Sequence, residues 1–309
     1  MNISQQEINI KLIKRIKNVG LDRNPKLVQL LNFNQINPDD QEIKQLILET
    51  LEAEEIKNIV DPDPFRTTNP IALEQIYGEL KIGFVEHSDI KYGIPLNDLV
   101  TNTLILGRSG GGKTSLVLLI LSQILASRKC GVIIFDRKRD YRCLVPLFPH
   151  FIYIHYTNFY DNILRPPQNV SLKVWLSTLF IIMANYFDLR VASRNLLMEK
   201  SLWLFKEKNY EETGQCPTLK EVYFLLENTK YPLISNKARH AESATNRLRG
   251  ILDNFGDNLC SPKRINWENV INLQITFGLD GLASDFQNFL IAVITSKIRL
   301  YIMVNQNRG

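Results

Sequence analysis

The chain contains the stretch Gly107-Arg108-Ser109-Gly110-Gly111-Gly112-Lys113-Thr114, which matches the phosphate-binding loop pattern G-x-x-x-x-G-K-[ST] in full. The short apolar run Thr103–Leu106 before it predicts a strand, and the apolar run Ser115–Leu121 after it predicts the start of a buried helix. In a strand–loop–helix unit, the loop N–H groups and the helix N-terminus point at one anion. This stretch therefore predicts an α/β fold that binds a nucleoside triphosphate.

Each residue type in this loop suits phosphate chemistry. Glycines let the backbone take positive φ and approach phosphates where a Cβ would clash. The Lys113 ammonium is expected to bridge the β- and γ-phosphates, and the Thr114 hydroxyl to ligate Mg²⁺. Arg108 is interpreted as facing solvent, with a phosphate or DNA contact as the alternative. The predicted nucleotide-binding residues are Gly107, Arg108, Ser109, Gly110, Gly111, Gly112, Lys113, Thr114 and Ser115.

Composition limits the other classes of protein. The chain has 309 residues, 45% of them hydrophobic, and a net charge of +5, which permits nucleic-acid binding without requiring it. Its four cysteines form no C-x-x-C pair, so we expect neither a disulfide framework nor a zinc site, and a reducing compartment. The apolar runs Leu116–Ala126 and Leu176–Phe187 are shorter than the roughly 18–20 residues that span a bilayer. We expect a cytoplasmic protein with no membrane partner.

Residues 1–78 are predicted to be a helical region followed by a linker. Apolar residues recur at helical spacing in two runs, Ile8, Leu12, Ile16 and Val19, and then Ile43, Ile47, Leu51 and Ile56. Pro38–Asp40 is a predicted helix start between them, and Asp61–Pro64 breaks the pattern as a stiff linker. Two interpretations stay open: an appendage that binds an accessory protein, or a helical prefix packed on the main domain.

Residues 79–309 alternate between predicted strands and helices, which indicates a parallel α/β sheet. The expected β segments are Lys81–Val85, Gly131–Asp136, Phe151–His155 and Leu273–Phe277, and Tyr92–Leu96 leads into the strand predicted before the glycine loop. The continuous apolar run before Asp136 is typical of a strand that is buried on both faces. Between about residue 171 and residue 256 the pattern is all-helical, which predicts a large helical insertion. The expected helices are Ser171–Phe187, Ala192–Lys208, Thr218–Asn228, Asn236–Phe255 and Ser284–Val304, with a capping box formed by Thr218 and Glu221.

Several segments carry a family resemblance. They are Lys81–Gly83, Tyr92–Leu96 leading to the glycine loop, Phe135–Tyr141, the proline-containing Asn162–Pro167, and Leu279–Leu282. Over about residues 80–309 the chain resembles the HerA/FtsK group of P-loop DNA-pumping ATPases, which includes the conjugative coupling proteins. Its N-terminal region does not resemble the β-barrel that many HerA proteins carry.

This resemblance implies a RecA-like fold, ATP hydrolysis with Mg²⁺ between subunits, and a homo-oligomeric, usually hexameric, ring around double-stranded DNA. Residues Gly107–Thr114 would hold the triphosphate and Mg²⁺, with Lys113 counted among the catalytic residues. Asp136 ends a strand that resembles a Walker B strand, and two roles stay open for it. It either ligates Mg²⁺ or positions water as a catalytic residue, or it orders the neighbouring loops as a strand-end acid.

The sequence departs from the family pattern in one respect. No apolar strand in it ends in Asp-Glu, the pair expected to orient Mg²⁺ and the attacking water. Asp280 follows an alternating apolar pattern, but Gly281 occupies the place that the glutamate would need. The resemblance places the Walker B strand beyond residue 309, so we expect the N-terminal part of a longer ATPase, or a degenerate one. This segment alone is expected to bind ATP without turnover.

Three functional hypotheses follow from the residues and the resemblance. The first is an ATP-binding subunit of an ATP-driven DNA translocase or helicase, and the second is a nucleotide-binding regulatory module without turnover. A P-loop small-molecule kinase is a weaker third. Basic residues cluster at Arg137–Arg139 with Arg142, and on one predicted helix at Lys237, Arg239, Arg247 and Arg249. They are interpreted either as phosphate contacts, to DNA or to a neighbouring subunit's nucleotide, or as solvated faces.

Overall fold

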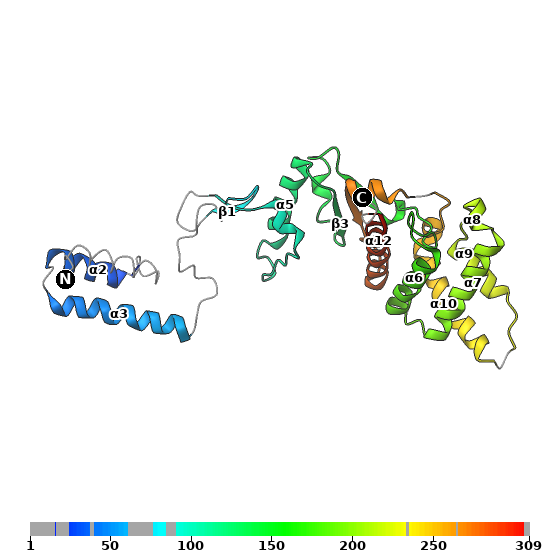
Figure 1. Cartoon of the computed structure of the whole chain (residues 1–309), viewed down its shortest axis with the longest axis horizontal. Helices are drawn as coiled ribbons and strands as arrows, with labels where there is room; N and C mark the ends of the chain where they lie inside the picture. Colours follow the sequence, from blue (N-terminus) through cyan, green and yellow to red (C-terminus); the bar gives the residue numbers. More distant parts are fainter. Residues whose placement is uncertain are drawn as a thin grey trace. The chain divides into compact units, whose positions relative to one another are not determined.

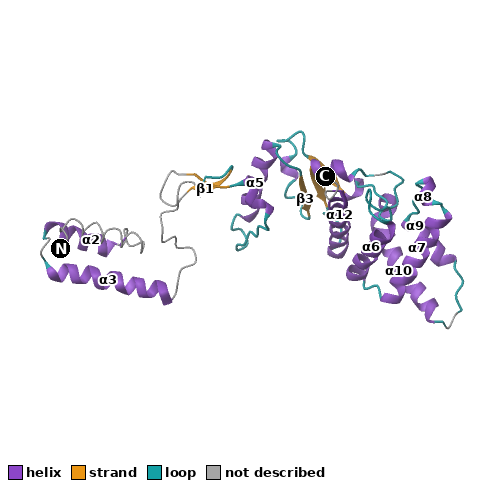
Figure 2. Cartoon of the chain, viewed as in Figure 1, coloured by secondary structure: helices purple, strands orange, loops and turns teal. Residues whose placement is uncertain are grey.

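The structure is a computed structural model, shown in Figures 1 and 2, and the chain divides into two compact units, Met1–Asn102 and Thr103–Gly309. It describes residues 16, 25–37, 40–60, 77–84, 91–232, 235–263 and 265–305. Each unit is described by itself below. The strand pair before residue 102 belongs to the first unit, so the predicted domain limits of 1–78 and 79–309 stay a prediction.

The first unit contains a pair of helices, α2 (Pro25–Ile36) and α3 (Gln41–Val60), which pack against each other. Leu27 of α2 and Ile47 and Leu51 of α3 form a small buried apolar cluster together with Ile16. Asp40 begins α3, because its carboxylate accepts the backbone N–H groups of Glu42 at 3.0 Å and Ile43 at 3.3 Å. The predicted helix and its start at Asp40 are therefore confirmed.

The rest of the first unit contains an antiparallel pair of strands, β1 (Leu80–Phe84) and β2 (Lys91–Ile94), followed by the 3-10 helix η1 (Leu96–Val100). The predicted apolar face of α3 ends earlier than expected, since the Ile56 side chain is 61% exposed. The predicted linker Asp61–Pro64 and the apolar residues Ile8, Leu12 and Val19 lie outside the described residues.

The second unit is built on a parallel sheet of β3 (Val132–Asp136), β4 (Ile152–His155) and β5 (Gln274–Gly278), in the order β3-β5-β4. All five residues of β5 are buried, whereas β3 is only partly buried and lies at an edge of the described sheet. The expectation that β3 is buried on both faces is therefore wrong. The central strand is β5, although it contains the polar residues Gln274 and Thr276. The Gln274 amide is accommodated there by a hydrogen bond to the carbonyl of Cys130 at 3.2 Å.

The strand predicted over Thr103–Leu106 does not form, and this expectation is also wrong. Leu104 and Leu106 are 78% and 79% exposed. A strand is stabilised by a ladder of hydrogen bonds to a neighbouring strand. No described strand pairs with these residues, so their apolar character alone does not fix an extended ladder.

Helix α5 (Lys113–Ser127) follows the glycine loop and packs against β3 through an apolar cluster that includes Leu125, Ile134, Leu144 and Phe151. The helices between β4 and β5 are α6 (Leu172–Phe187), α7 (Val191–Glu207), α8 (Tyr210–Thr213), α9 (Leu219–Asn228) and α10 (Asn236–Phe255). Along the chain, α11 (Trp267–Asn272) precedes β5 and α12 (Ser284–Asn305) follows it. Short 3-10 helices connect the strands and helices: η2 (Arg142–Leu144), η3 (Tyr156–Asn158) and η4 (Gly256–Leu259).

The five helices predicted between residues 171 and 304 agree with the observed ones to within a residue at their ends, whereas α5 begins two residues before the predicted start at Ser115. The pattern did not reveal the short helices α8 and α11. The capping box is confirmed: the Thr218 hydroxyl accepts the Glu221 N–H at 3.3 Å, and the Glu221 carboxylate accepts the Thr218 N–H at 2.8 Å. Helix α12 is long and apolar enough, by length and composition, to cross a membrane. In the structure it contributes Phe289, Leu290, Val293 and Ile294 to the hydrophobic core.

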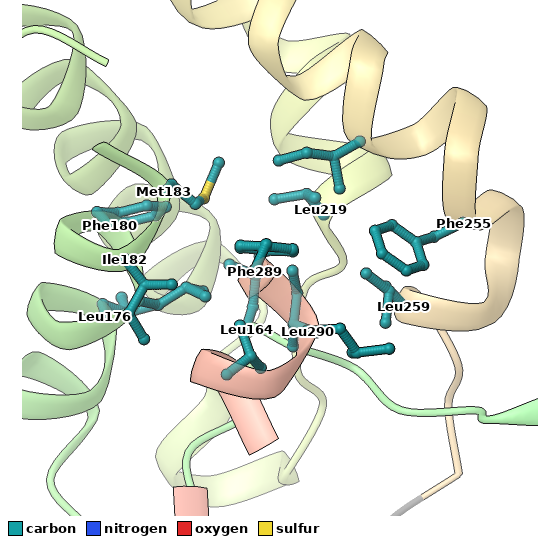
Figure 3. Close-up of a cluster of buried hydrophobic side chains, with 14 of the residues drawn as sticks. Leu164, Leu176, Phe180, Ile182, Met183, Leu219, Phe255, Leu259, Phe289 and Leu290 are labelled. Carbon is teal, nitrogen blue, oxygen red and sulfur yellow. The ribbon is translucent and has the colours of Figure 1, made fainter. Parts of the chain in front are cut away.

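The inserted helices and the sheet share one hydrophobic core. Figure 3 shows side chains from four helices gathered in it: Phe180 and Met183 of α6, Leu219 of α9, Phe255 of α10 and Phe289 of α12. The same cluster includes Ile275 and Phe277 of β5. The helices between β4 and β5 therefore pack as part of the second unit, without a separate core of their own.

A buried ion pair lies inside this core. The Lys297 ammonium of α12 bonds to the Asp161 carboxylate and to the carbonyl of Asn162 at 3.1 Å. It also lies over the rings of Trp175, at 5.2 Å, and Trp267, at 5.6 Å. Burial lowers the pKa of Lys297 and raises the pKa of Asp161, while the charge of each partner opposes the shift in the other.

Replacing Lys297 with Met should destabilise the second unit by about 3–5 kcal/mol, because the Asp161 carboxylate would stay buried without its counter-ion. The free energy of unfolding is measured by urea denaturation. The double variant with Asp161→Asn should recover part of the loss, since it leaves no buried charge. A loss below about 1 kcal/mol in the single variant would contradict a structural role for this pair.

Candidate functional site

The glycine loop forms a tight turn that leads directly into α5. Gly110 and Gly112 have φ values of 74° and 77°, a region that residues with a Cβ rarely adopt. The Gly111 N–H donates to the carbonyl of Arg108 at 3.0 Å and closes the turn. Gly112 is the N-cap of α5, so the first free N–H groups of the helix follow the turn directly. This backbone has the form that an anion-binding loop requires.

The polar side chains of the loop are gathered at the start of α5. The Lys113 ammonium folds over the loop and donates to the carbonyls of Gly107 at 2.8 Å and Arg108 at 2.7 Å. Thr114 and Ser115 follow in the first helical turn and are exposed, and within the described part of the chain their hydroxyls make no hydrogen bond. Arg108 is exposed as well. The structure thus brings all the predicted nucleotide-binding residues into one continuous, accessible loop.

Asp136 lies at the carboxyl end of β3 and is 1% exposed. Its carboxylate accepts three backbone N–H groups, from Lys138 at 3.2 Å, Asp140 at 3.0 Å and Tyr141 at 3.1 Å. Its own carbonyl accepts the N–H of Leu279 at 2.8 Å. These bonds give Asp136 a loop-ordering role, while a role in binding Mg²⁺ or water stays a prediction.

A second carboxylate, Asp280, lies just beyond the end of β5 and forms a network that the sequence did not reveal. It pairs with the Arg139 guanidinium, and it accepts from the Tyr153 hydroxyl at 3.4 Å. The His155 ring nitrogen Nε2 lies 3.1 Å from its carbonyl and 3.4 Å from its carboxylate. Partial burial favours the neutral form of Asp280, but the hydrogen bond from Arg139 and the charges of His155 and Arg139 outweigh it and lower the pKa.

Gly278 makes room for this network. A Cβ at Gly278 would lie 2.2 Å from the Tyr153 hydroxyl, so only glycine lets Tyr153 cross the end of β5. Burial raises the pKa of Tyr153, and the negative charges of Asp280 and Asp136 raise it further. The strand register offered one signal for this cluster, since Asp136, Gly278 and His155 are directly paired across the three strand ends. In parallel α/β sheets, ligand-binding groups usually lie at the carboxyl ends of the strands.

Metal-binding groups are not clustered elsewhere in the described part of the chain. Within it, no group of three or more His, Cys, Asp or Glu side chains is placed to hold an ion. The predicted metal residues Thr114 and Asp136 are of a different kind, since a P-loop NTPase holds Mg²⁺ partly through the nucleotide phosphates. Their assignment stays a prediction.

The fold and the loop together define a P-loop nucleotide-binding domain of the α/β class. A family model described as "Helicase HerA, central domain" matches residues 80–298. The chain belongs to this family and is a P-loop ATPase of the HerA/FtsK type. This finding confirms the family resemblance.

The chain was also compared with curated proteins and with solved structures. No curated protein matches the chain. Among solved structures, the chain is similar to VirB4 of Thermoanaerobacter pseudethanolicus, at 16% sequence identity and a TM-score of 0.48. That match covers 75% of this chain and 65% of the VirB4 chain.

Replacing Asp136 with Asn tests its loop-ordering role. An amide oxygen still accepts the Lys138 and Asp140 N–H groups, but the amide nitrogen would face the N–H of Tyr141 and leave it without an acceptor. We expect a loss of about 1–3 kcal/mol in the free energy of unfolding, measured in urea. The exposed neighbour Asp140, replaced with Asn, is the control and should stay within about 0.5 kcal/mol of the wild type. Equal effects of the two substitutions would disprove this role.

Proposed function

We propose that this chain is the ATP-binding subunit of a HerA/FtsK-like, ATP-driven DNA translocase or helicase. The observation that carries the proposal is the loop Gly107–Ser115, with its two positive-φ glycines and with Lys113 as the first residue of α5. Membership of the HerA central-domain family supports the same conclusion. Both the backbone and the side chains of the loop suit a triphosphate.

The loop residues have distinct roles in this proposal. The Lys113 ammonium exchanges the carbonyls of Gly107 and Arg108 for oxygens of the β- and γ-phosphates and stabilises charge during phosphoryl transfer. The Thr114 hydroxyl, exposed and without a partner among the described residues, is a suitable ligand for Mg²⁺. Bound Mg²⁺ neutralises phosphate charge. Asp136 is the proposed second metal or water contact, and it would use the acceptor capacity that its three N–H bonds leave free.

The assembly and its partners are part of the proposal. HerA/FtsK-type ATPases work as rings, so we propose a homo-oligomer around double-stranded DNA, in the cytoplasm. The helical region within residues 1–78 is the proposed docking element for an accessory protein. Because no strand in the sequence ends in Asp-Glu, this chain alone is expected to bind ATP without turning it over.

A second candidate function is a nucleotide-binding regulatory module that never hydrolyses ATP. The observation that favours it is the position after Asp280, where Gly281 has φ of 91° and offers no catalytic carboxylate. Asp280 itself is paired with Arg139. The two candidates share the nucleotide site and differ in the DNA partner.

Replacing Lys113 with Ala tests the nucleotide site. The substitution removes charge-assisted contacts worth about 1.5–3 kcal/mol, so the affinity for Mg²⁺–ATP should fall about 10- to 150-fold. Isothermal titration of the purified chain measures it. Lys129→Ala, which removes an exposed lysine shortly after α5, is the charge-matched control and should bind as the wild type does. Unchanged affinity in Lys113→Ala would show that the loop assignment is wrong.

Binding of duplex DNA separates the two candidate functions. A translocase subunit should bind a fluorescent duplex of mixed sequence with a Kd of about 10⁻⁴–10⁻⁶ M at physiological salt, the usual range for sequence-independent contacts. Fluorescence anisotropy measures the affinity, and the Lys113→Ala variant serves as a control that lacks only the nucleotide contact. A chain that binds ATP but no duplex would favour the regulatory module.

A further inference from the structure

The segment Arg137–Arg142, called the basic loop below, presents a dense group of cations at the carboxyl end of β3. Arg137, Lys138, Arg139 and Arg142 are all exposed, and the one acidic side chain exposed in the same segment is Asp140. Exposed cations on a surface loop are common, so their number alone implies nothing specific. The way in which the loop is held is the informative feature.

The backbone of the basic loop is fixed from inside the protein. The buried Asp136 carboxylate accepts its N–H groups at Lys138, Asp140 and Tyr141. Arg139 has φ of 65°, a left-handed conformation that residues other than glycine rarely adopt. Such strain persists only where the surroundings determine the conformation, and it is concentrated at functional sites. The loop is therefore ordered before any ligand arrives.

Two of its four cations are also held by side chains from a distant part of the sequence. Arg139 pairs with Asp280, whose carboxylate is in turn contacted by Tyr153 and His155. The Arg137 guanidinium donates to the side-chain carbonyl of Asn288 in α12. Arg139 nevertheless stays 61% exposed. These contacts fasten the loop to β4, β5 and α12.

The other two cations of the basic loop, Lys138 and Arg142, are not paired with an acidic side chain among the described residues. Among the described residues, neither the Lys138 ammonium nor the Arg142 guanidinium makes a hydrogen bond or an ion pair. The Arg142 guanidinium lies over the Tyr153 ring, 5.9 Å from its centroid, which limits its freedom without neutralising it. Two exposed, unpaired cations on a preordered loop are suited to contact anionic groups at a low entropic cost.

We propose that the basic loop is a contact surface for the sugar–phosphate backbone of duplex DNA, with Lys138 and Arg142 as its phosphate contacts. Arg139 and Asp280 are positioning residues for this surface. The proposal rests on the DNA partner of the proposed function and adds to it the surface and the mode of contact. Contacts from Lys138 and Arg142 to phosphate and sugar would fix the position of the duplex and would carry no base-sequence information.

The test removes the two uncommitted cations and leaves the positioning network intact. The double variant Lys138→Ala/Arg142→Ala is compared with Lys173→Ala/Arg190→Ala, which removes the same net charge from exposed, unpaired residues at α6 and the start of α7. Anisotropy with a short duplex of mixed sequence gives the affinity as a function of salt. Titration with Mg²⁺–ATP checks that each variant is folded and keeps its nucleotide site.

Losing two phosphate contacts should lower the slope of log affinity against log salt by about 1.8 and weaken binding by about 10- to 60-fold at about 0.1 M salt. The control double variant should keep the wild-type slope. The inference is overturned if the two double variants behave alike while the wild type binds the duplex. If the wild type binds ATP but no duplex at all, the DNA partner fails together with this surface, and the nucleotide site stands.

Discussion

The buried ammonium of Lys297 is the constraint on which the second unit depends. A charge in a core is tolerated only where its partners are in place, and here they come from several elements: Asp161 and Asn162 after β4, Trp175 of α6 and Trp267 of α11. Satisfying them together fixes the position of α12 against the inserted helices. The same helix carries Asn288, which holds Arg137, and Gln287, whose amide donates to the carbonyls of Leu279 and Leu282 at 3.1 Å. Helix α12 thus connects the buried ion pair with the residues at the carboxyl edge of the sheet.

At that edge of the sheet, two carboxylates hold different parts of the basic loop. Asp136, at the end of β3, holds the backbone of the basic loop, and Asp280, beyond β5, holds one of its side chains. A carboxylate has about four acceptor positions, so three N–H bonds leave Asp136 about one for a metal ion or a water molecule. The Asp136 carboxylate therefore has enough acceptor positions both to order the loop and to contact Mg²⁺. Any metal ion or water that it binds would use the same carboxylate that holds the loop backbone. This sharing would link the two proposed roles physically.

The sequence pattern predicted those features that depend on interactions between residues close together in the chain. The glycine loop, the amphipathic helix Asn236–Phe255 and the capping box at Thr218 were all readable, because each depends on residues a few positions apart. The strand expected over Thr103–Leu106 was wrong, because pairing needs a neighbour that apolar residues do not specify. The central place of β5 was missed for a similar reason: Gln274 and Thr276 are polar, and the Gln274 amide is accommodated in the core by the carbonyls of Ile124 and Cys130, which the local pattern does not reveal. The pair Arg139–Asp280 joins residues 141 positions apart, so only the strand register brings it into view.

In the sequence, the glycine loop precedes and the basic loop follows one stretch of chain, residues 113–136. Lys113 begins α5, Asp136 ends β3, and the two elements share the cluster of Leu125 and Ile134. In the proposed function both loops bind phosphate, by different physical means. A terminal triphosphate is compact and reaches the backbone, so glycines and a helix N-terminus suit it. The phosphates of a duplex are spread along a wide surface, so long cationic side chains on a fixed backbone suit them. The contrast is consistent with a glycine-rich first loop and with a second loop whose backbone is held by Asp136 and whose Arg139 side chain is held by Asp280.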